Sequence, residues 1–335
     1  MGVLLSKHAA DRIFAEWAAK YDVYAPMLME GEGCFSDTDI IRYGKPASLD
    51  EIEWNRKSDY SFKEVLLSIN ETLFYFTEDQ TTVPQGPEKD ILIFLRACDL
   101  HAVKRLDQIY LDNQFGDFYY SRVREHAKFI LMGCSETCET GFCVSMGTNI
   151  AEDYDAYIKV EGDKVYADIK NPQLDEMREA GEAADVTPDH VKENKEKVTL
   201  PKNIDPMKVK DFAMWKEYGG RCINCGRCNF ACPTCTCFTM QDIFYNDNAK
   251  AGERRRVWAS CQIEDYDTIA GGIKFRRENA DRVRFKVMHK VYDFGKRFGY
   301  PMCVGCGRCD AICPEYISHS NMINRLAKEV DEYEK

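Results

Sequence analysis

The chain has 335 residues, of which 44% are hydrophobic and 30% are charged, and its formal net charge is −11. These values are typical of a globular protein, and the length is more than one small core requires, so we expect two domains. No apolar run reaches the roughly 18 residues that a membrane-spanning helix needs. The first residues, MGVLLSKHAADRIF, lack the features of a signal peptide. The sequence therefore predicts a cytoplasmic protein without membrane insertion.

Sixteen cysteines are unusual in a cytoplasmic chain. The cytoplasm is reducing, so a framework of disulfides is not expected there. A high cysteine count in that compartment instead indicates metal or redox chemistry. Iron–sulfur and zinc sites both agree with the count, and the spacing of the cysteines must distinguish between them.

Several elements are predicted in the first half of the chain. Apolar residues recur about every four positions over residues 4–21, which predicts a helix. Ser61 followed by Glu64 has the pattern of a capping box at the start of a second helix. Residues 91–97 and 129–132 are apolar runs typical of buried strands, and residues 101–111 between them resemble a helix. This strand–helix–strand order predicts an α/β domain with some parallel sheet.

Four cysteines lie close to these two strands. Cys98 follows the first strand, Cys134 follows the second, and Cys138 and Cys143 lie on the loop after it. Because the carboxyl ends of parallel strands share one edge of a sheet, we expect these thiols to face one crevice. They could hold a third iron–sulfur cluster, with Asp99 as a substitute or supporting ligand. Four packed thiols or a zinc site remain alternatives, since the spacing matches no standard motif.

The next part of the chain contains a hairpin and then a change in charge. Alternating residues 157–169 predict a β-hairpin around Gly162-Asp163. Residues 161–205 end in a polar stretch that has the pattern of a helix and a linker. From Pro206 onward the net charge is +5, which leaves −16 for the preceding residues. We therefore predict domains at residues 1–205 and 206–335.

Two copies of one cysteine motif dominate the second domain. CINCGRCNFACP and CVGCGRCDAICP both have the spacing C-x2-C-x2-C-x3-C-P of bacterial-type 4Fe–4S proteins. The first three cysteines of a copy surround one cluster, with Gly226, Gly305 and Gly307 allowing a close backbone approach, and the fourth binds the other cluster. The predicted ligands are Cys222, Cys225, Cys228 and Cys313 for one cluster, and Cys303, Cys306, Cys309 and Cys232 for the other.

This spacing favours iron–sulfur over zinc. A structural zinc site usually pairs two C-x2-C units and needs neither the third cysteine nor the following C-P. Residues 234–302 separate the two copies and are rich in helix formers and basic residues, so we predict a mainly α, ferredoxin-like dicluster domain with a long helical insert. The basic residues could steer an acidic redox partner, or they could form an ordinary solvated surface.

The remaining cysteines and the missing motifs give weaker predictions. Cys34, Cys235, Cys237 and Cys261 are expected to pack as small apolar side chains. His289 is expected to pack or to cap a helix. The sequence has no dinucleotide-binding G-x-G-x-x-G, no P-loop and no nucleic-acid-binding motif, and no catalytic residue is predicted.

The chain resembles a family of iron–sulfur proteins that includes the electron-transfer component of anaerobic sulfite reductases and the β subunits of sulfhydrogenases. Both cysteine motifs fit that resemblance, and the group of Cys98, Cys134, Cys138 and Cys143 is similar to positions in the family. The other segments that carry the resemblance are YDVYAP (21–26), IIRYG (40–44), KEVLLSINETLFYF (63–76), RACDLHAV (96–103), FCVSMG (142–147), CPTCTCF (232–238) and WASC (258–261).

The resemblance implies a non-catalytic electron-transfer subunit in a hetero-oligomer. In the sulfite reductase branch, such a subunit passes electrons from a flavin subunit that oxidises NADH to a sirohaem subunit that reduces sulfite to sulfide. YDVYAP and IIRYG favour this branch, and the alternative is the β subunit of a sulfhydrogenase-type nickel–iron hydrogenase. The resemblance also favours a third cluster. Substrate reduction by the chain itself and an iron–sulfur sensor are further hypotheses, which the missing motifs disfavour.

Overall fold

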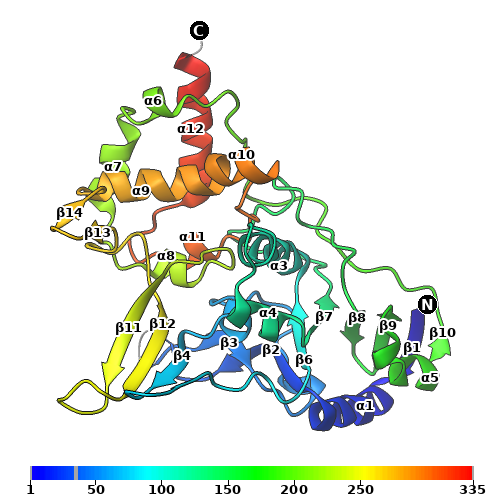
Figure 1. The fold of residues 1–335 in the computed structure, drawn as a ribbon. Helices are drawn as coiled ribbons and strands as arrows, with labels where there is room; N and C mark the ends of the chain where they lie inside the picture. Colours follow the sequence, from blue (N-terminus) through cyan, green and yellow to red (C-terminus); the bar gives the residue numbers. More distant parts are fainter. Residues whose placement is uncertain (1, 34–36, 334–335) are drawn as a thin grey trace.

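The computed structural model describes residues 2–33 and 37–333. A mixed sheet with the strand order β10-β1-β9-β8-β7-β6-β2-β3 forms the core of the first domain (Figure 1). The strands of this sheet are β1 (Gly2–Ser6), β2 (Asp22–Met29), β3 (Ile40–Gly44), β6 (Ile91–Leu95), β7 (Ala127–Met132), β8 (Ala156–Glu161), β9 (Lys164–Ile169) and β10 (Glu182–Ala183).

The parallel part of the sheet confirms the predicted α/β architecture. β6 pairs in parallel with both β2 and β7, and β7 pairs in parallel with β8. Helix α3 (Ala97–Tyr110) connects β6 to β7 and begins four residues before the helix expected from the sequence. β8 and β9 form the predicted antiparallel hairpin around Gly162-Asp163.

Helices cover both faces of the sheet. Every residue of β6 is buried, so its alternating side chains pack in two cores. Leu92 and Phe94 pack beneath α1 (Lys7–Lys20), whereas Ile93 packs beneath α3 on the opposite face. The remaining short helices of this region are η1 (Leu49–Glu51), α2 (Lys63–Leu66), α4 (Phe118–Arg124), η2 (Pro172–Leu174) and α5 (Glu176–Ala180).

The structure corrects three local predictions in this domain. Residues 4–6 belong to β1, where they pair with β9, and the helix begins at Lys7 with the Ser6 side chain as its cap. The Ser61 hydroxyl does not cap α2; it is buried without a hydrogen-bond partner, and the helix begins at Lys63. The polar helix expected before residue 205 is reduced to the five residues of α5. At residues 4–6, pairing with a distant strand overrules the helical spacing of the sequence.

Helices form the core of the C-terminal part. α7 contributes Met214 and Trp215, α9 contributes Val287, and α12 contributes Ile323 and Leu326 to one buried cluster. The helices here are α6 (Pro206–Val209), α7 (Met214–Arg221), α8 (Arg227–Phe230), α9 (Asn279–Met288), the π-helix η3 (His289–Asp293), α10 (Phe294–Phe298), α11 (Arg308–Ala311) and α12 (His319–Tyr333). No helix within the described ranges is long and apolar enough to cross a membrane.

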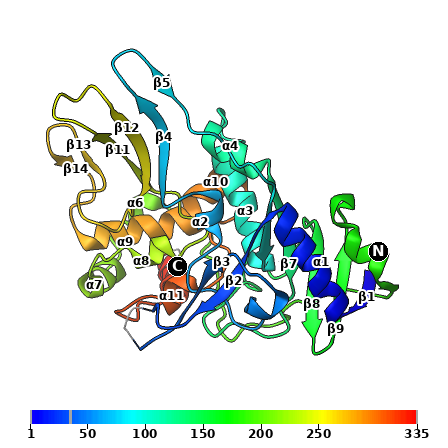
Figure 2. The same cartoon turned by 90° about the horizontal axis from the view of Figure 1, so that it is seen from below.

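The insert between the two cysteine motifs is not mainly helical, which corrects the sequence prediction. It begins with a long antiparallel hairpin, and β12 pairs with β4 of the first domain (Figure 2). Buried Arg256 on β12 binds Glu71 at 2.8 Å and Asp117 at 2.7 Å, so this basic residue is engaged within the chain. The strands outside the large sheet are β4 (Asn70–Phe76), β5 (Thr81–Thr82), β11 (Phe238–Phe244), β12 (Gly252–Trp258), β13 (Thr268–Ile269) and β14 (Ile273–Lys274).

A buried ion pair joins the first domain to the second cysteine motif. Asp99, in the first turn of α3, accepts hydrogen bonds from the Arg308 guanidinium at 2.6 and 3.1 Å, and both side chains are almost completely buried. Arg308 also donates to the backbone and side-chain oxygens of Ser58. Burial opposes the charge on Arg308, but Asp99 and nearby cysteines outweigh that effect and raise its pKa well above the usual value.

Replacing Asp99→Asn should destabilise the chain by about 3–5 kcal/mol, because the buried Arg308 charge loses its counter-charge. Anaerobic thermal unfolding would measure the effect. Glu193→Gln, which removes an exposed ion pair with Lys197, is the control and should leave the unfolding midpoint unchanged. Equal midpoints for Asp99→Asn and the parent chain would contradict this role of the ion pair.

Candidate metal centres

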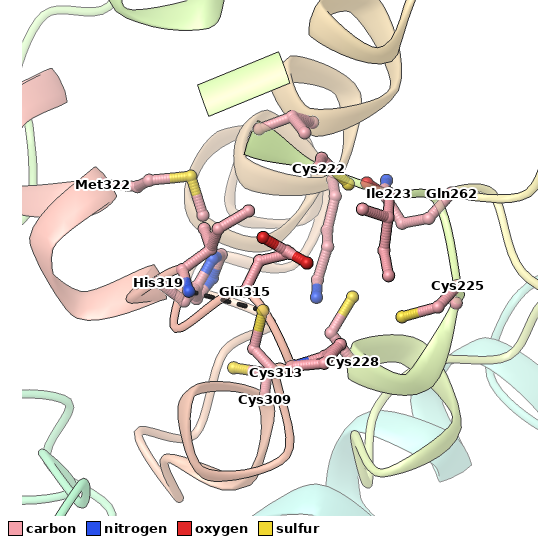
Figure 3. Close-up of a pocket in the computed structure, with 15 residues that line it drawn as sticks. Cys222, Ile223, Cys225, Cys228, Gln262, Cys309, Cys313, Glu315, His319 and Met322 are labelled. Carbon is pink, nitrogen blue, oxygen red and sulfur yellow. Dashed lines mark hydrogen bonds between the residues drawn. The ribbon is translucent and has the colours of Figure 1, made fainter. Parts of the chain in front are cut away.

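The structure brings cysteines of both motifs together around one cavity of about 50 Å³. Cys222, Cys225 and Cys228 come from the first motif, and Cys313 and Cys309 from the second (Figure 3). Cys222 and Cys225 lie between α7 and α8, and Cys228 lies in α8, after Gly226, which adopts a φ of +74° that favours glycine. The fourth cysteine of the second motif therefore lies beside the first three cysteines of the first motif.

A second cavity, of about 20 Å³, contains the complementary group. Cys303, Cys306 and Cys309 line it together with Cys232, the last cysteine of the first motif. Cys309 lines both cavities, so the two groups of thiols are neighbours.

Backbone amides point at sulfur atoms in both groups. The Ile317 amide donates to Cys313 Sγ at 3.3 Å, and the Gly305 amide donates to Cys303 Sγ at 3.4 Å. Such bonds stabilise negative charge on a thiolate and are the supporting contacts expected around cluster ligands.

Buried cations lie beside the same thiols. Lys286 lines both cavities, and Lys290 lines the second. Burial opposes the charge of each ammonium group, but the neighbouring cysteines outweigh it and raise both pKa values. In the described part of the chain neither lysine pairs with a carboxylate, and an uncompensated buried charge is costly. Anionic thiolates with a bound cluster would supply the missing charge, so these residues fit two iron–sulfur clusters.

The cysteines of the first domain also converge. Cys98, Cys134, Cys138 and Cys143 line a cavity of about 20 Å³, and Cys306 of the second motif lines it as well. Arg96 donates to Cys134 Sγ at 3.3 Å, and the Asn194 amide lies 3.7 Å from Cys143 Sγ. The structure therefore places the predicted group at the carboxyl ends of β6 and β7, next to the second cavity.

Asp99 does not line this cavity, so the structure does not place it among the direct ligands. Both of its carboxylate oxygens accept hydrogen bonds from Arg308. Asp99 instead has a structural role, because it fixes the adjacent Cys98 relative to the second motif.

The glycines of the second motif have a role that the sequence did not reveal. A Cβ atom on Gly305 would lie 2.6 Å from Phe142 O, and one on Gly307 would lie 2.0 Å from Thr140 O. The Phe142 amide donates to Gly305 O at 2.7 Å, and the Thr140 hydroxyl donates to Gly307 O at 2.8 Å. These glycines allow the loop carrying Cys138 and Cys143 to lie against the second motif.

Three cysteines that were expected to pack as small apolar side chains lie together in the structure. Cys235, Cys237 and Cys261 line a further cavity together with His289. The short spacing in CPTCTCF was a signal, but Cys261 and His289 are too distant in sequence to be assigned to the same group. Cys34 lies outside the described residues.

Comparison with known proteins identifies the class of the C-terminal part. Residues 221–317 match the family described as a 4Fe-4S dicluster domain, which confirms the prediction of two 4Fe–4S clusters. No solved structure matches the chain.

A relative extends the similarity to most of the chain. The protein is homologous to sulfhydrogenase 2 subunit beta of Pyrococcus furiosus, with 29% identity over 303 residues, which are 85% of this chain and 88% of the relative. This homology and the dicluster domain confirm the resemblance to the wider family of iron–sulfur subunits.

Gly307→Ala should destabilise the chain more than Gly299→Ala. Both glycines have positive φ values, +69° and +83°, so both substitutions cost about 1–2 kcal/mol of backbone strain. Only the Cβ at position 307 would lie within 4 Å of another atom. The difference in stability between the two variants therefore measures the cost of the contact with Thr140. Thermal unfolding under anaerobic conditions would compare them. Equal losses for the two variants would show that the close approach at Gly307 is unimportant.

Proposed function

We propose that this chain is the iron–sulfur subunit that transfers electrons within a multi-subunit reductase. It has no catalytic site of its own in this proposal. The observation that carries the proposal is the side-by-side arrangement of thiol-lined cavities. Cys306 lines both the cavity of the first domain and the second dicluster cavity, and Cys309 lines both dicluster cavities. A bound 4Fe–4S cluster accepts and donates single electrons, so adjacent clusters provide a path through the protein.

The proposed electron donor and electron acceptor come from the resemblance of the sequence to the sulfite reductase branch of the family. We propose that a flavin subunit oxidising NADH supplies the electrons and that a sirohaem subunit uses them to reduce sulfite to sulfide. The chain's own contribution is to hold the cofactors in place and to tune them with buried charges such as Lys286.

The alternative is a sulfhydrogenase-type role. It is supported by the similarity to sulfhydrogenase 2 subunit beta over most of the chain. In that case the partner would contain a nickel–iron centre in place of sirohaem, while the relay function of this chain would be the same. The partners that co-purify with the chain under anaerobic conditions distinguish the two roles.

The proposed ligand sets exchange their fourth cysteines. We assign Cys313 to the cluster held by the first motif, because these cysteines line the first cavity. Cys313→Ser should therefore damage that cluster, and Cys232→Ser, the reciprocal variant, should damage the other. Anaerobic iron analysis and EPR of the reduced proteins would identify which signal each variant loses. Loss of the Cys303 cluster alone in Cys313→Ser would reverse the assignment.

The third cavity is proposed to hold a third 4Fe–4S cluster. Cys138→Ser should then lower the iron content by about four atoms per chain, because one cubane loses a ligand. Glu136→Gln changes a side chain lining the same cavity without removing a thiol, so its iron content should match that of the parent chain. Unchanged iron in a folded Cys138→Ser variant would leave packed thiols or zinc as the explanation of the group.

The relay function predicts that the isolated chain has no turnover of its own. Dithionite should reduce it, but it should neither oxidise NADH nor reduce sulfite, because NADH delivers a hydride and the chain supplies only one-electron carriers. Adding the flavin subunit should allow NADH to reduce the clusters, and adding the sirohaem subunit should complete the path to sulfide. Turnover of either substrate by the chain alone would contradict the proposal.

A further inference from the structure

A further group of metal-binding side chains lines a separate cavity of about 110 Å³. Cys235 and Cys237 lie between α8 and β11, Cys261 follows β12, and His289 is the first residue of η3. The β11–β12 hairpin brings Cys237 close to Cys261, since the Ala259 amide donates to Cys237 O at 2.9 Å. This cavity is larger than either dicluster cavity, at about 50 and 20 Å³, so it has room for a cofactor of the same size.

The imidazole of His289 is held in a fixed position beside the cavity. His289 lies where α9 widens into a π-helix, a distortion that frequently marks a functional site. Its ring stacks on Phe285, with centroids 5.6 Å apart and planes 12° apart. The imidazole of histidine is the commonest metal ligand among protein side chains.

The sulfur atom of Cys261 has the supporting contacts of a metal ligand. The Asn229 amide donates to Cys261 Sγ at 3.0 Å, and the Gln262 amide lies 3.7 Å from the same atom. A cysteine that only filled space would not require such donors, because apolar packing leaves the sulfur without hydrogen bonds.

Positive charge surrounds this cavity. Lys290 and Arg276 line it, and buried Lys63 donates to Cys235 O at 2.8 Å while its ammonium group lies 4.0 Å from the centre of the Trp258 ring. Within the described ranges Lys63 and Lys290 have no carboxylate partner. These cations would favour an anionic occupant of the cavity, and Lys290 also lines the second dicluster cavity.

The donors around this cavity are not arranged to hold a single metal ion. Among residues 2–33 and 37–333, no three His, Cys, Asp or Glu side chains are close enough to hold one metal ion, and this includes the dicluster cysteines. In a cubane each thiolate binds a different iron, so its ligands stand further apart than those of a single zinc ion.

We propose that Cys235, Cys237, Cys261 and His289 bind an additional 4Fe–4S cluster with three thiolate ligands and one imidazole ligand. Cys235 follows Cys232 of the second dicluster group, and Lys286 and Lys290 line both cavities. The additional cluster would therefore extend the row of centres toward the β11–β12 hairpin.

The first test is metal content of the full chain, purified anaerobically. Cys261→Ser and Cys237→Ser should each lower iron and acid-labile sulfide by about four atoms per chain. Ser260→Ala, a change at the buried neighbour of Cys261, is the control and should retain the parent content. The iron content of each variant is compared with that of the parent chain. The result therefore does not depend on whether the first-domain cavity holds a cluster or on which partner subunits the chain has. Unchanged iron in folded variants, or one zinc per chain removed by them, would overturn the proposal.

The second test concerns the imidazole ligand. Pulsed EPR of the reduced parent protein should detect the nuclear coupling of a directly bound imidazole nitrogen. His289→Cys should abolish that coupling while keeping the iron content, because a thiolate can replace the imidazole, and it should shift the reduction potential of one cluster. This variant retains all three cysteines, so the result does not depend on the folding of the serine variants. Absence of a nitrogen coupling in the parent protein would contradict the proposed ligand.

Discussion

The ion pair between Asp99 and Arg308 fixes the position of the first domain relative to the second cysteine motif. Asp99 follows Cys98, and Arg308 lies between Cys306 and Cys309, so one buried contact aligns residues of two thiol groups. The loop bearing Cys143 is held against the same motif, since Thr148 donates to Val304 O at 2.6 Å. An ion pair buried this deeply stabilises little by itself, but it strongly disfavours any arrangement that separates its partners.

This alignment produces a continuous row of sites through the interior. Cys306 is shared by the cavities of the first domain and the second dicluster group, and Cys309 is shared by the two dicluster groups. Lys286 contacts the two dicluster cavities and the one beside His289. A single buried charge can therefore influence several centres, because its field is weakly screened away from water.

The spacing of the cysteines was sufficient to predict the dicluster domain. The contacts between segments distant in the sequence could not be predicted. The two C-x2-C-x2-C-x3-C-P runs identified the dicluster domain, and the apolar runs before Cys98 and Cys134 gave the parallel strands. The strands of the insert were missed because β12 pairs with β4, about 180 residues earlier, and Arg256 is fixed by Glu71 across the same distance. The grouping of Cys261 with His289 was missed for the same reason, since neither residue lies in a motif.

We propose that the thiol-lined cavities hold neighbouring clusters that together form one electron-transfer path. EPR spectroscopy of the anaerobically purified full chain, fully reduced with dithionite, tests it most directly. Clusters that share cavity walls should interact magnetically, so the account predicts a broad, spin-coupled spectrum that simplifies as the potential is raised and single clusters are oxidised. A spectrum that equals the sum of isolated, non-interacting clusters at every potential would contradict the account.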